Sequence, residues 1–297
     1  MKSTPYYSCY KLLEANGNQR IGGTCIVVRH RTSLFLVTAR HCVDRKYRNP
    51  SDVSVLPETL TVQGFVKDDF SRYIASQHME FHVSNWTFGE SWNDIAIGRI
   101  DGFTQTPIFL WNTDLVDGAS DSEIEIGNEV VFSGYPDGIE AEDSSLPSMV
   151  LRKGVVASHP AMNIVVPGAL GKDYCLVDAF SQNGFSGSPV FALIYRVLDL
   201  HQTLEDFAER NLDRRVSFFG SNRILLQSSP EFVFLGVNCG HFKTASDRSS
   251  GVHAGLSYYI KSSVVLSTLA SCANVEKLDR FVTVGSAQLP LSNALQL

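Results

Sequence analysis

The sequence lacks the features that would place the chain in a membrane or export it. None of its apolar runs approaches the roughly 18 residues that a membrane-spanning helix needs. The first residues, MKSTPYYSCYKLLEANGNQR, contain no continuous apolar core of the kind found in signal peptides. We therefore expect a cytoplasmic protein without a membrane partner.

Charge is also sparse, since charged residues make up 19% of the chain and the formal net charge is −6. Nucleic-acid binding relies on Lys and Arg clustered on one face, and the sequence shows no such cluster, so no nucleic-acid partner is expected. The 44% of hydrophobic residues is typical of a globular protein, and 297 residues suffice for one large or two smaller modules.

Paired cysteine motifs are missing as well. There is no C-x-x-C and no Cys/His spacing typical of zinc sites, so neither a metal nor a cofactor is expected. Without a sign of secretion, we interpret the cysteines as reduced thiols that act as small hydrophobic residues. The six are Cys9, Cys25, Cys42, Cys175, Cys239 and Cys272.

What the chain does have is a series of short β-rich runs separated by Gly, Pro, Asn and Asp, a pattern typical of an all-β sandwich or barrel. Only residues 203–215 and 262–271 indicate helices, the first of them amphipathic. The strand candidates are TCIVVRH, SLFLVTA, LTVQGFV, YIASQHMEFHVS, DIAIGRI, EVVFSGYP, MVLRKGVVA, YCLVDAF, SPVFALI, FVFLGVNCG and AGLSYYIKS.

One stretch, DAFSQNGFSGSPVF, surrounds Ser186 with Gly184, Gly187 and Pro189. Glycine permits sharp bends and close backbone approach, and proline fixes the direction in which the chain leaves. Such a serine suits a nucleophile with backbone N–H groups beside it. It suits equally a tight turn without a catalytic role, so this motif alone leaves both interpretations open.

An activated serine needs a base, and the base needs an acceptor that fixes its tautomer. The best base is His41, which follows the strand-like run SLFLVTA. The best acceptor is Asp94, which opens the apolar run IAIGRI. Each has an ordinary interpretation alone, but the order His, Asp, Ser across two β-rich halves points to nucleophilic catalysis.

With these residues, the sequence resembles the trypsin-like serine proteases of the chymotrypsin fold, and most closely their bacterial high-temperature-requirement branch. LVTARHCV, NDIAIGRI and DAFSQNGFSGSPVF carry the resemblance, with weaker support from VVFSGYPDG, VLRKGVVAS and FLGVNCG. It extends from about Gly22 to Val265, and the chain after it is too short for the peptide-binding PDZ domain that secreted relatives often carry.

The resemblance implies two six-stranded antiparallel β-barrels with the active site in the cleft between them, a short C-terminal helix and a helical insertion. The expected divisions are an N-terminal extension 1–19, a first barrel 20–112, a linker 113–128, a second barrel 129–265 and a tail 266–297. The insertion, residues 193–229, either packs on the barrel or docks a partner; insertions of this length in a compact domain are typically functional or disordered.

The resemblance also assigns roles to residues. His41, Asp94 and Ser186 fall on the catalytic triad, and the backbone N–H groups of Gly184 and Ser186 on the oxyanion hole. The pocket for the substrate residue before the cleaved bond would have Phe180 at its base. Its remaining wall would come from Asn238, Cys239 and Gly240.

Two departures from the family pattern, and one cluster of polar side chains, bear on these assignments. Ser188 stands where the family has glycine, and Phe185 where a zymogen-type enzyme has aspartate, so activation by cleavage at RIGGTC, residues 20–25, is rejected. The Gly22-Gly23 pair is instead expected beside the active site. HMEFH, residues 78–82, places two histidines and a glutamate on one strand face, which we interpret as the solvent side and not a metal site.

The sequence therefore predicts a serine endopeptidase acting on protein or peptide substrates. Two alternatives stay open: a catalytically silent binding module with the same fold, and an esterase or self-processing enzyme with the same nucleophile.

Overall fold

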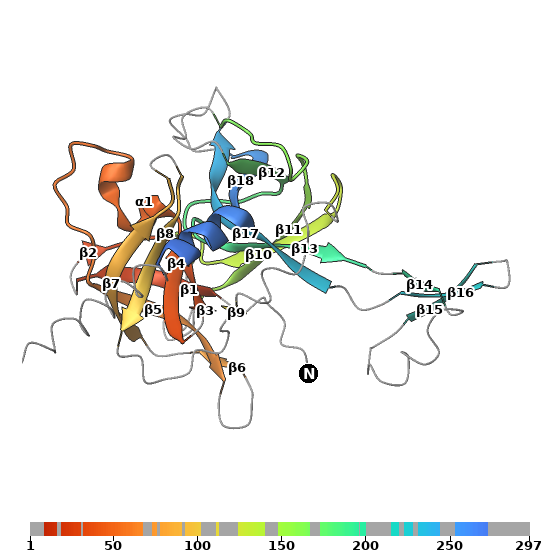
Figure 1. The fold of residues 1–297 in the computed structure, drawn as a ribbon, viewed down its shortest axis with the longest axis horizontal. Coiled ribbons are helices and arrows are strands. Elements are labelled where there is room, and N and C mark those ends of the chain that lie inside the picture. The colour runs from red at the N-terminus through yellow and green to blue at the C-terminus, as the bar shows by residue number, and fades with distance from the viewer. Residues whose placement is uncertain are drawn as a thin grey trace, which may run out of the picture.

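The computed structural model describes residues 9–16, 19–30, 32–67, 73–75, 78–90, 93–101, 111–112, 124–139, 148–166, 173–195, 197–199, 215–219, 223–227, 231–243 and 253–272. Almost all of the regular structure is β-strand, and the strands form two barrels that lie side by side (Figure 1).

The first barrel is a ring of six antiparallel strands in the order β1-β3-β4-β8-β7-β5, closed by pairing of β1 with β5. The short strands β2 (Gln19–Arg20), β6 (Tyr73–Ala75) and β9 (Trp111–Asn112) pair at its periphery. The ring strands are β1 (Cys9–Ala15), β3 (Thr24–His30), β4 (Ser33–Thr38), β5 (Thr59–Lys67), β7 (Met79–Phe88) and β8 (Ala96–Asp101).

The second barrel closes in the order β10-β11-β12-β18-β17-β13, again with antiparallel pairs. Both barrels are therefore six-stranded, as the resemblance implied. Its strands are β10 (Glu129–Gly134), β11 (Val150–Val156), β12 (Tyr174–Asp178), β13 (Pro189–Ile194), β17 (Glu231–Lys243) and β18 (His253–Lys261).

Strand β7 shows how the residue pattern sets the faces of the first barrel. Met79, Phe81 and Val83 are buried, whereas Glu80 and His82 are exposed. This alternation follows from the two-residue period of a strand. The polar face of HMEFH is thus the solvent side, and the two exposed groups form a 3.5 Å pair between His82 Nε2 and Glu80 Oε1.

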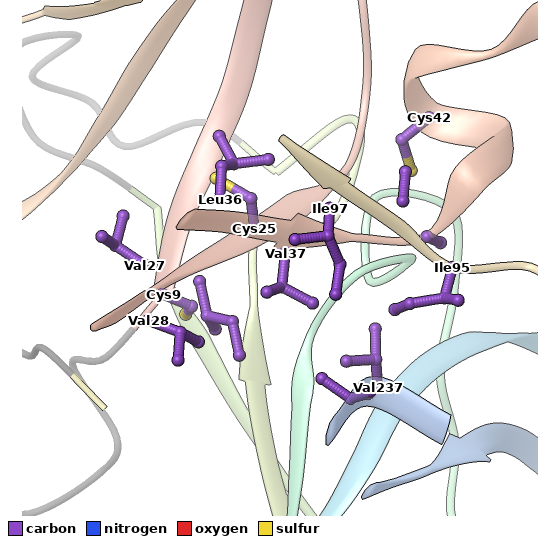
Figure 2. Packing of buried hydrophobic residues seen from close by; sticks show 14 of the residues in the cluster. Cys9, Cys25, Val27, Val28, Leu36, Val37, Cys42, Ile95, Ile97 and Val237 are labelled. Atoms are coloured by element: carbon purple, nitrogen blue, oxygen red, sulfur yellow. The ribbon is translucent and has the colours of Figure 1, made fainter. Parts of the chain in front are cut away.

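Strand β3 does not alternate, because Thr24 to Val28 are all buried. Thr24 of this strand contacts the second barrel, since its hydroxyl donates to Gly184 O at 2.8 Å. A single core cluster accordingly joins first-barrel residues with Val131, Tyr135 and Val237 of the second barrel. Figure 2 shows Val237 near Ile95 and Ile97 of the first barrel. The two barrels therefore share one apolar interior at their contact.

Polar contacts reinforce this contact between the barrels. The Tyr135 hydroxyl donates to the main-chain oxygen of Cys9 at 3.1 Å, and the Cys9 thiol lies 3.4 Å from Ser133 O. A second cluster, centred on Phe132, Phe185 and Tyr259, fills the second barrel. Residues 179–188, between β12 and β13, carry Ser186 and are called the serine loop. Because Phe185 directly precedes Ser186, the core of this barrel supports this loop.

Helices are few in the described residues. They comprise α1 (Arg40–Val43), the 3₁₀ turn η2 (Arg45–Tyr47) and residues 262–272, where a helix was predicted. The last one packs Val265, Leu269 and Cys272 into the shared core. No helix among the described residues is long and apolar enough to cross a membrane.

The structure differs from the expected divisions at two places. Strand β1 lies within the segment 1–19 that was predicted to be an extension, so the first barrel begins at Cys9. The insertion contributes a three-stranded sheet, β14 (Val197–Asp199), β16 (Arg223–Gln227) and β15 (Arg215–Phe219), which projects from the second barrel (Figure 1). The helix predicted within the insertion falls largely on residues 201–214, outside the described residues. Partner docking there stays a prediction.

Candidate active site

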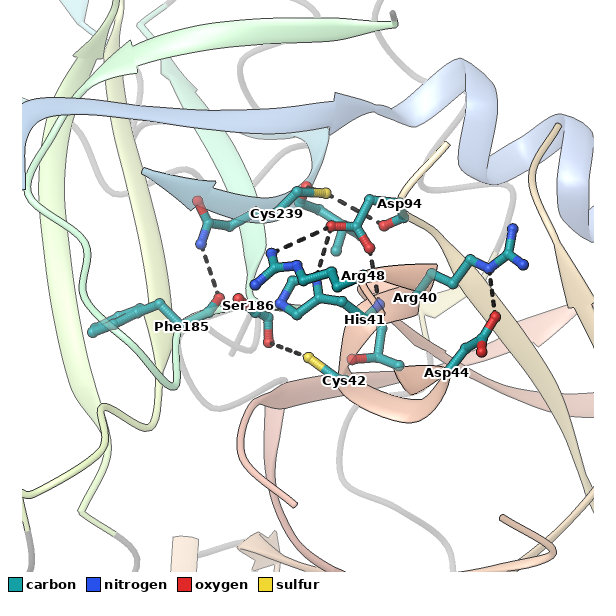
Figure 3. A network of polar contacts seen from close by, with 12 residues as sticks. Arg40, His41, Cys42, Asp44, Arg48, Asp94, Phe185, Ser186 and Cys239 are labelled. Atoms are coloured by element: carbon teal, nitrogen blue, oxygen red, sulfur yellow. Dashed lines mark hydrogen bonds and ion pairs between the residues drawn. The ribbon is translucent and has the colours of Figure 1, made fainter. Parts of the chain in front are cut away.

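His41 is presented by a short helix that starts directly where β4 ends. Ala39, still extended, precedes α1, and a helix of only four residues has little stability of its own. Arg40 supplies the missing support. Its guanidinium pairs with Asp44 at 2.9 Å and lies 4.2 Å from the centre of the Phe88 ring and 4.9 Å from that of Tyr47. The His41 backbone is held in place as a result (Figure 3).

Two hydrogen bonds connect His41 with Asp94. The His41 main-chain N–H donates to Asp94 Oδ1 at 2.9 Å, and ring Nδ1 lies 2.7 Å from Oδ2. With a carboxylate facing it, Nδ1 carries the proton, which leaves Nε2 as the acceptor in the neutral ring. The pair therefore provides a histidine whose tautomer and orientation are fixed.

Burial and charge oppose each other at this pair. Burial alone would lower the pKa of the His41 ring, but the Asp94 carboxylate beside it raises the pKa to about 9. Burial would likewise raise the pKa of Asp94, yet the imidazolium and the two hydrogen bonds from His41 hold it below its usual value. Asp94 is thus ionised and stabilises a protonated His41.

Two further groups contact Asp94. Arg48, itself more than half exposed, places a guanidinium nitrogen 3.9 Å from Oδ2. The buried Cys239 thiol donates to the Asp94 main-chain oxygen at 3.4 Å. The cation adds to the stabilisation of the carboxylate, and the thiol ties the first barrel to β17 next to the histidine.

Ser186 lies on a loop of the second barrel whose backbone requires glycine at two positions. Gly184 and Gly187 adopt positive φ angles of 94° and 91°. A side-chain carbon at Gly184 would overlap the Tyr135 carbonyl, and one at Gly187 would overlap the Thr24 carbonyl. The glycines of this stretch are therefore required by geometry, because the backbone has positive φ angles there and packs against neighbouring main chain.

The backbone donors beside Ser186 are oriented by their own peptide units. In a trans peptide the carbonyl and the N–H point in opposite directions. The Asn183 carbonyl accepts from Asp137 N at 2.9 Å, which turns the Gly184 N–H the other way. The Phe185 carbonyl accepts from Ser188 N and Asn238 Nδ2, both at 3.0 Å, which does the same for the Ser186 N–H.

Within the described part of the chain, neither the Gly184 nor the Ser186 N–H donates a hydrogen bond. Two neighbouring free donors, each fixed through its carbonyl, form an arrangement that binds a negatively charged oxygen. Thr24 of the first barrel completes the loop's support. Its N–H donates to Ser186 O at 2.7 Å and its hydroxyl to Gly184 O at 2.8 Å.

Ser186 and His41 come from different barrels and face each other across the contact (Figure 3). Among the described residues no hydrogen bond joins the Ser186 hydroxyl to the His41 ring. Such bonds commonly form only once substrate is bound. The Cys42 thiol, next to His41 in the chain, donates to Ser186 O at 3.7 Å, so the two segments are in direct contact.

The residues predicted to form the substrate pocket lie near this loop. Phe180 is 48% exposed, and the guanidinium carbon of Arg152 lies 5.4 Å from the centre of its ring. Asn238 is buried and bound to the serine loop. The Cys239 side chain points toward Asp94, and Gly240 packs against the Tyr258 hydroxyl, where a side-chain carbon would come within 2.5 Å.

The residues described by the structure contain no group of three or more His, Cys, Asp or Glu side chains that could hold a metal ion. His41, Asp94, Ser186 and the two backbone donors are groups suited to proton transfer, nucleophilic attack and electrostatic stabilisation.

The profile of the trypsin-like peptidase domain matches residues 23–198, which is more than half of the sequence. The chain belongs to this family. The matched range contains His41, Asp94 and Ser186.

The chain is also similar to solved structures. The protease Anisep from Arthrobacter nicotinovorans superposes with a TM-score of 0.50 at 12% identity, over 90% of this chain and 95% of that one. Deg5 has a TM-score of 0.45 at 16% identity, over 89% of this chain and 88% of that one. The thermostable serine protease AL20 from an extremophilic microorganism has a TM-score of 0.49 at 10% identity, over 89% of this chain and 95% of that one. No curated protein matches the sequence.

Sequence reasoning missed several residues that shape this trypsin-like site. Thr24, Arg40 and Arg152 make no motif of their own. Arg40 was open to recognition, because it directly precedes the histidine. Gly23, by contrast, lies beside the site as expected, since a side-chain carbon there would come within 3.2 Å of Ser186 O.

Proposed function

We propose that this trypsin-like peptidase is a serine endopeptidase with His41, Asp94 and Ser186 as its catalytic triad. The observation that carries the proposal is the doubly hydrogen-bonded His41–Asp94 pair, which faces Ser186 beside two free backbone donors. A base of fixed tautomer, a serine and an oxyanion site are the three parts that acyl transfer needs.

The reaction begins when Ser186 Oγ attacks the carbonyl carbon of a peptide bond and His41 Nε2 takes the hydroxyl proton. The carbonyl π electrons move onto oxygen, which becomes the oxyanion of a tetrahedral intermediate. The intermediate collapses to an ester with Ser186, and His41 returns its proton to the departing amine. Water then attacks the ester in the same way, releasing the acid and restoring the serine.

Asp94 acts through charge and orientation in both halves of this cycle. The carboxylate stays ionised because His41 and Arg48 surround it, and it stabilises the imidazolium that forms during attack. The Gly184 and Ser186 N–H groups bind the oxyanion, and loss of one such donor costs roughly 3–4 kcal/mol in comparable sites.

Three other functions remain as outcomes of the test. A silent binding module of this fold would leave Ser186 unreactive. An esterase would turn over simple esters but not peptides. The same serine would also serve a chain that cleaves only itself.

A fluorophosphonate probe and a peptide library together separate these functions. We expect the probe to label the wild-type chain at Ser186 and not Ser186→Ala, and we expect internal cleavage of library peptides. A chain that the probe does not label would be a binding module. Labelling with ester turnover alone would establish an esterase.

A further inference from the structure

The serine loop contains a tight turn that presents the Gly184 N–H. The Phe185 N–H donates to the Gln182 carbonyl at 3.1 Å, which closes a four-residue turn over residues 182–185. The oxyanion donor therefore lies inside this turn, and its direction depends on how firmly the two ends of the turn are held.

One side chain from outside the loop contacts both ends of this turn. A terminal guanidinium nitrogen of Arg152 donates to the Gln182 side-chain oxygen at 3.3 Å. The same guanidinium lies 5.8 Å from the centre of the Phe185 ring. It also lies 5.4 Å from the ring of Phe180, two residues before the turn.

The strand pair beneath the turn explains why Arg152 can do this. Arg152 on β11 is the direct cross-strand partner of Phe132 on β10. The Phe132 ring meets the Phe185 ring edge to face, with centroids 5.5 Å apart and planes at 80°. Phe185 is completely buried between them, so the turn rests on a platform made of one aromatic ring and one guanidinium.

The Arg152 side chain is specialised for this position. Its Nε is buried and has no hydrogen-bond partner among the described residues, so the guanidinium is held by the two rings and Gln182. Removing a guanidinium nitrogen from water without a partner is costly. Lys153, the next residue, points the other way and pairs with Glu129 at 2.8 Å on the exposed face.

We infer that Arg152 is a positioning residue that clamps the turn 182–185 and thereby aims the Gly184 N–H at the substrate oxygen. The inference rests on the proposed function and adds to it a residue that touches neither substrate nor the triad. It predicts that Arg152 contributes to the stabilisation of the transition state and hardly changes the affinity for bound substrate.

The test compares Arg152→Met, which keeps the bulk but loses the guanidinium, with the control Lys153→Met. For Arg152→Met we expect kcat to fall about 10- to 100-fold, less than the roughly 100- to 1,000-fold that follows removal of an oxyanion donor, while KM changes by no more than about threefold. Affinity for a peptide boronic acid, which forms a tetrahedral adduct with serine, should fall in parallel with kcat/KM. Arg152→Lys should fall between wild type and Arg152→Met, because it keeps the charge and loses the planar donor pair.

A second measurement does not depend on activity. Amide hydrogen exchange of residues 180–188, followed by mass spectrometry, should speed up in Arg152→Met and stay at the wild-type rate in Lys153→Met. Unchanged exchange would overturn the clamp whether or not the protein is a protease. Faster exchange with unchanged kcat would overturn its role in catalysis.

Gln182→Ala provides a variant with a milder effect on folding. If the clamp acts through Gln182, the losses in kcat for Arg152→Met and Gln182→Ala will not multiply in the double variant. Fully multiplicative losses would contradict the inference. A wild-type chain that no fluorophosphonate labels would refute the proposed function alone, since the exchange experiment would still report on the turn.

Discussion

The main-chain N–H and the ring Nδ1 of His41 both form hydrogen bonds with the carboxylate of Asp94, and a different oxygen accepts each bond. The first bond fixes the backbone of α1 and the second fixes the ring. A single acidic residue therefore sets both the position and the tautomer of His41.

Asp94→Asn should separate these two roles. The amide oxygen can still accept one of the bonds, but the amide cannot stabilise an imidazolium and favours the wrong tautomer. We expect kcat to fall by about 10⁴-fold with little change in KM. Steady-state kinetics on a peptide substrate would measure this, and a loss below tenfold would exclude Asp94 from the triad.

Ser186→Ala and His41→Ala should each lower kcat by about 10⁶-fold, because the triad acts as a unit. Ser188→Ala is the matched control from the same loop. The Ser188 hydroxyl is buried without a hydrogen-bond partner among the described residues, so its removal should leave the melting temperature equal or higher. Equal losses of kcat in Ser186→Ala and Ser188→Ala would contradict the assignment of Ser186 as the nucleophile.

The pH dependence follows from the His41–Asp94 pair. His41 must be neutral to accept a proton, and its pKa lies above the ordinary 6.5, at about 9, so kcat/KM should rise with pH and be half-maximal near pH 9. Stability runs the other way. The contribution of a histidine with a raised pKa is fully present below its unfolded value and is lost as pH rises through about 9.

Asp94→Asn offers the control for this dependence, since removing the negative charge should move the rising limb of kcat/KM to lower pH. Activity that is constant from pH 6 to pH 9 in the wild-type chain would show that another group is the base.

All six cysteines are buried and free in the structure, and burial raises the pKa of Cys9 to about 12 and shifts Cys25 and Cys239 in the same direction. Since the thiolate is the reactive form, a thiol reagent should modify the native chain slowly and all six residues after unfolding. Reductant should leave activity and melting temperature unchanged. A two-hydrogen mass difference on reduction, localised to Cys25 and Cys42, would contradict this.

Cleavage should follow small or medium apolar residues such as Ala, Val or Leu. Phe180 is expected at the base of the pocket, where an enzyme specific for Lys or Arg would need a carboxylate. The Arg152 guanidinium on the Phe180 ring disfavours a second cation there. A peptide library would measure the preference. Dominant cleavage after Lys or Arg would place an acidic residue in the pocket instead, and Asp178, exposed at the end of β12, is the first to replace by Asn.

Much of the β architecture could be predicted from sequence because alternation and turn residues are local signals. TCIVVRH, for example, coincides with β3. Strand β1 was missed because Lys11 and Glu14 interrupt its apolar pattern and a bulge between Leu12 and Glu14 shifts its register. Its buried face becomes evident only once β3 and β5 lie on either side of it.

The site divides in the same way. His41, Asp94 and Ser186 occur in short motifs that a reader of the sequence can recognise. Thr24 and Arg152 act on a loop 160 and about 30 residues away, and no local pattern marks a contact that exists only after the barrels close. Arg40 could be predicted only in part. It adjoins the histidine in the sequence, but its stacking on Phe88 of β7 appears only in the folded chain.

The bonds from Thr24 to the serine loop have a consequence for biosynthesis. His41 and Asp94 are synthesised before Ser186, and the loop that carries Ser186 is held by hydrogen bonds from Thr24 of the first barrel. An unfinished or unfolded chain thus holds no complete set of the proposed catalytic residues. Under the proposed function, proteolytic activity therefore begins only when both barrels have docked, and the chain's own unfolded segments are not cleaved during synthesis.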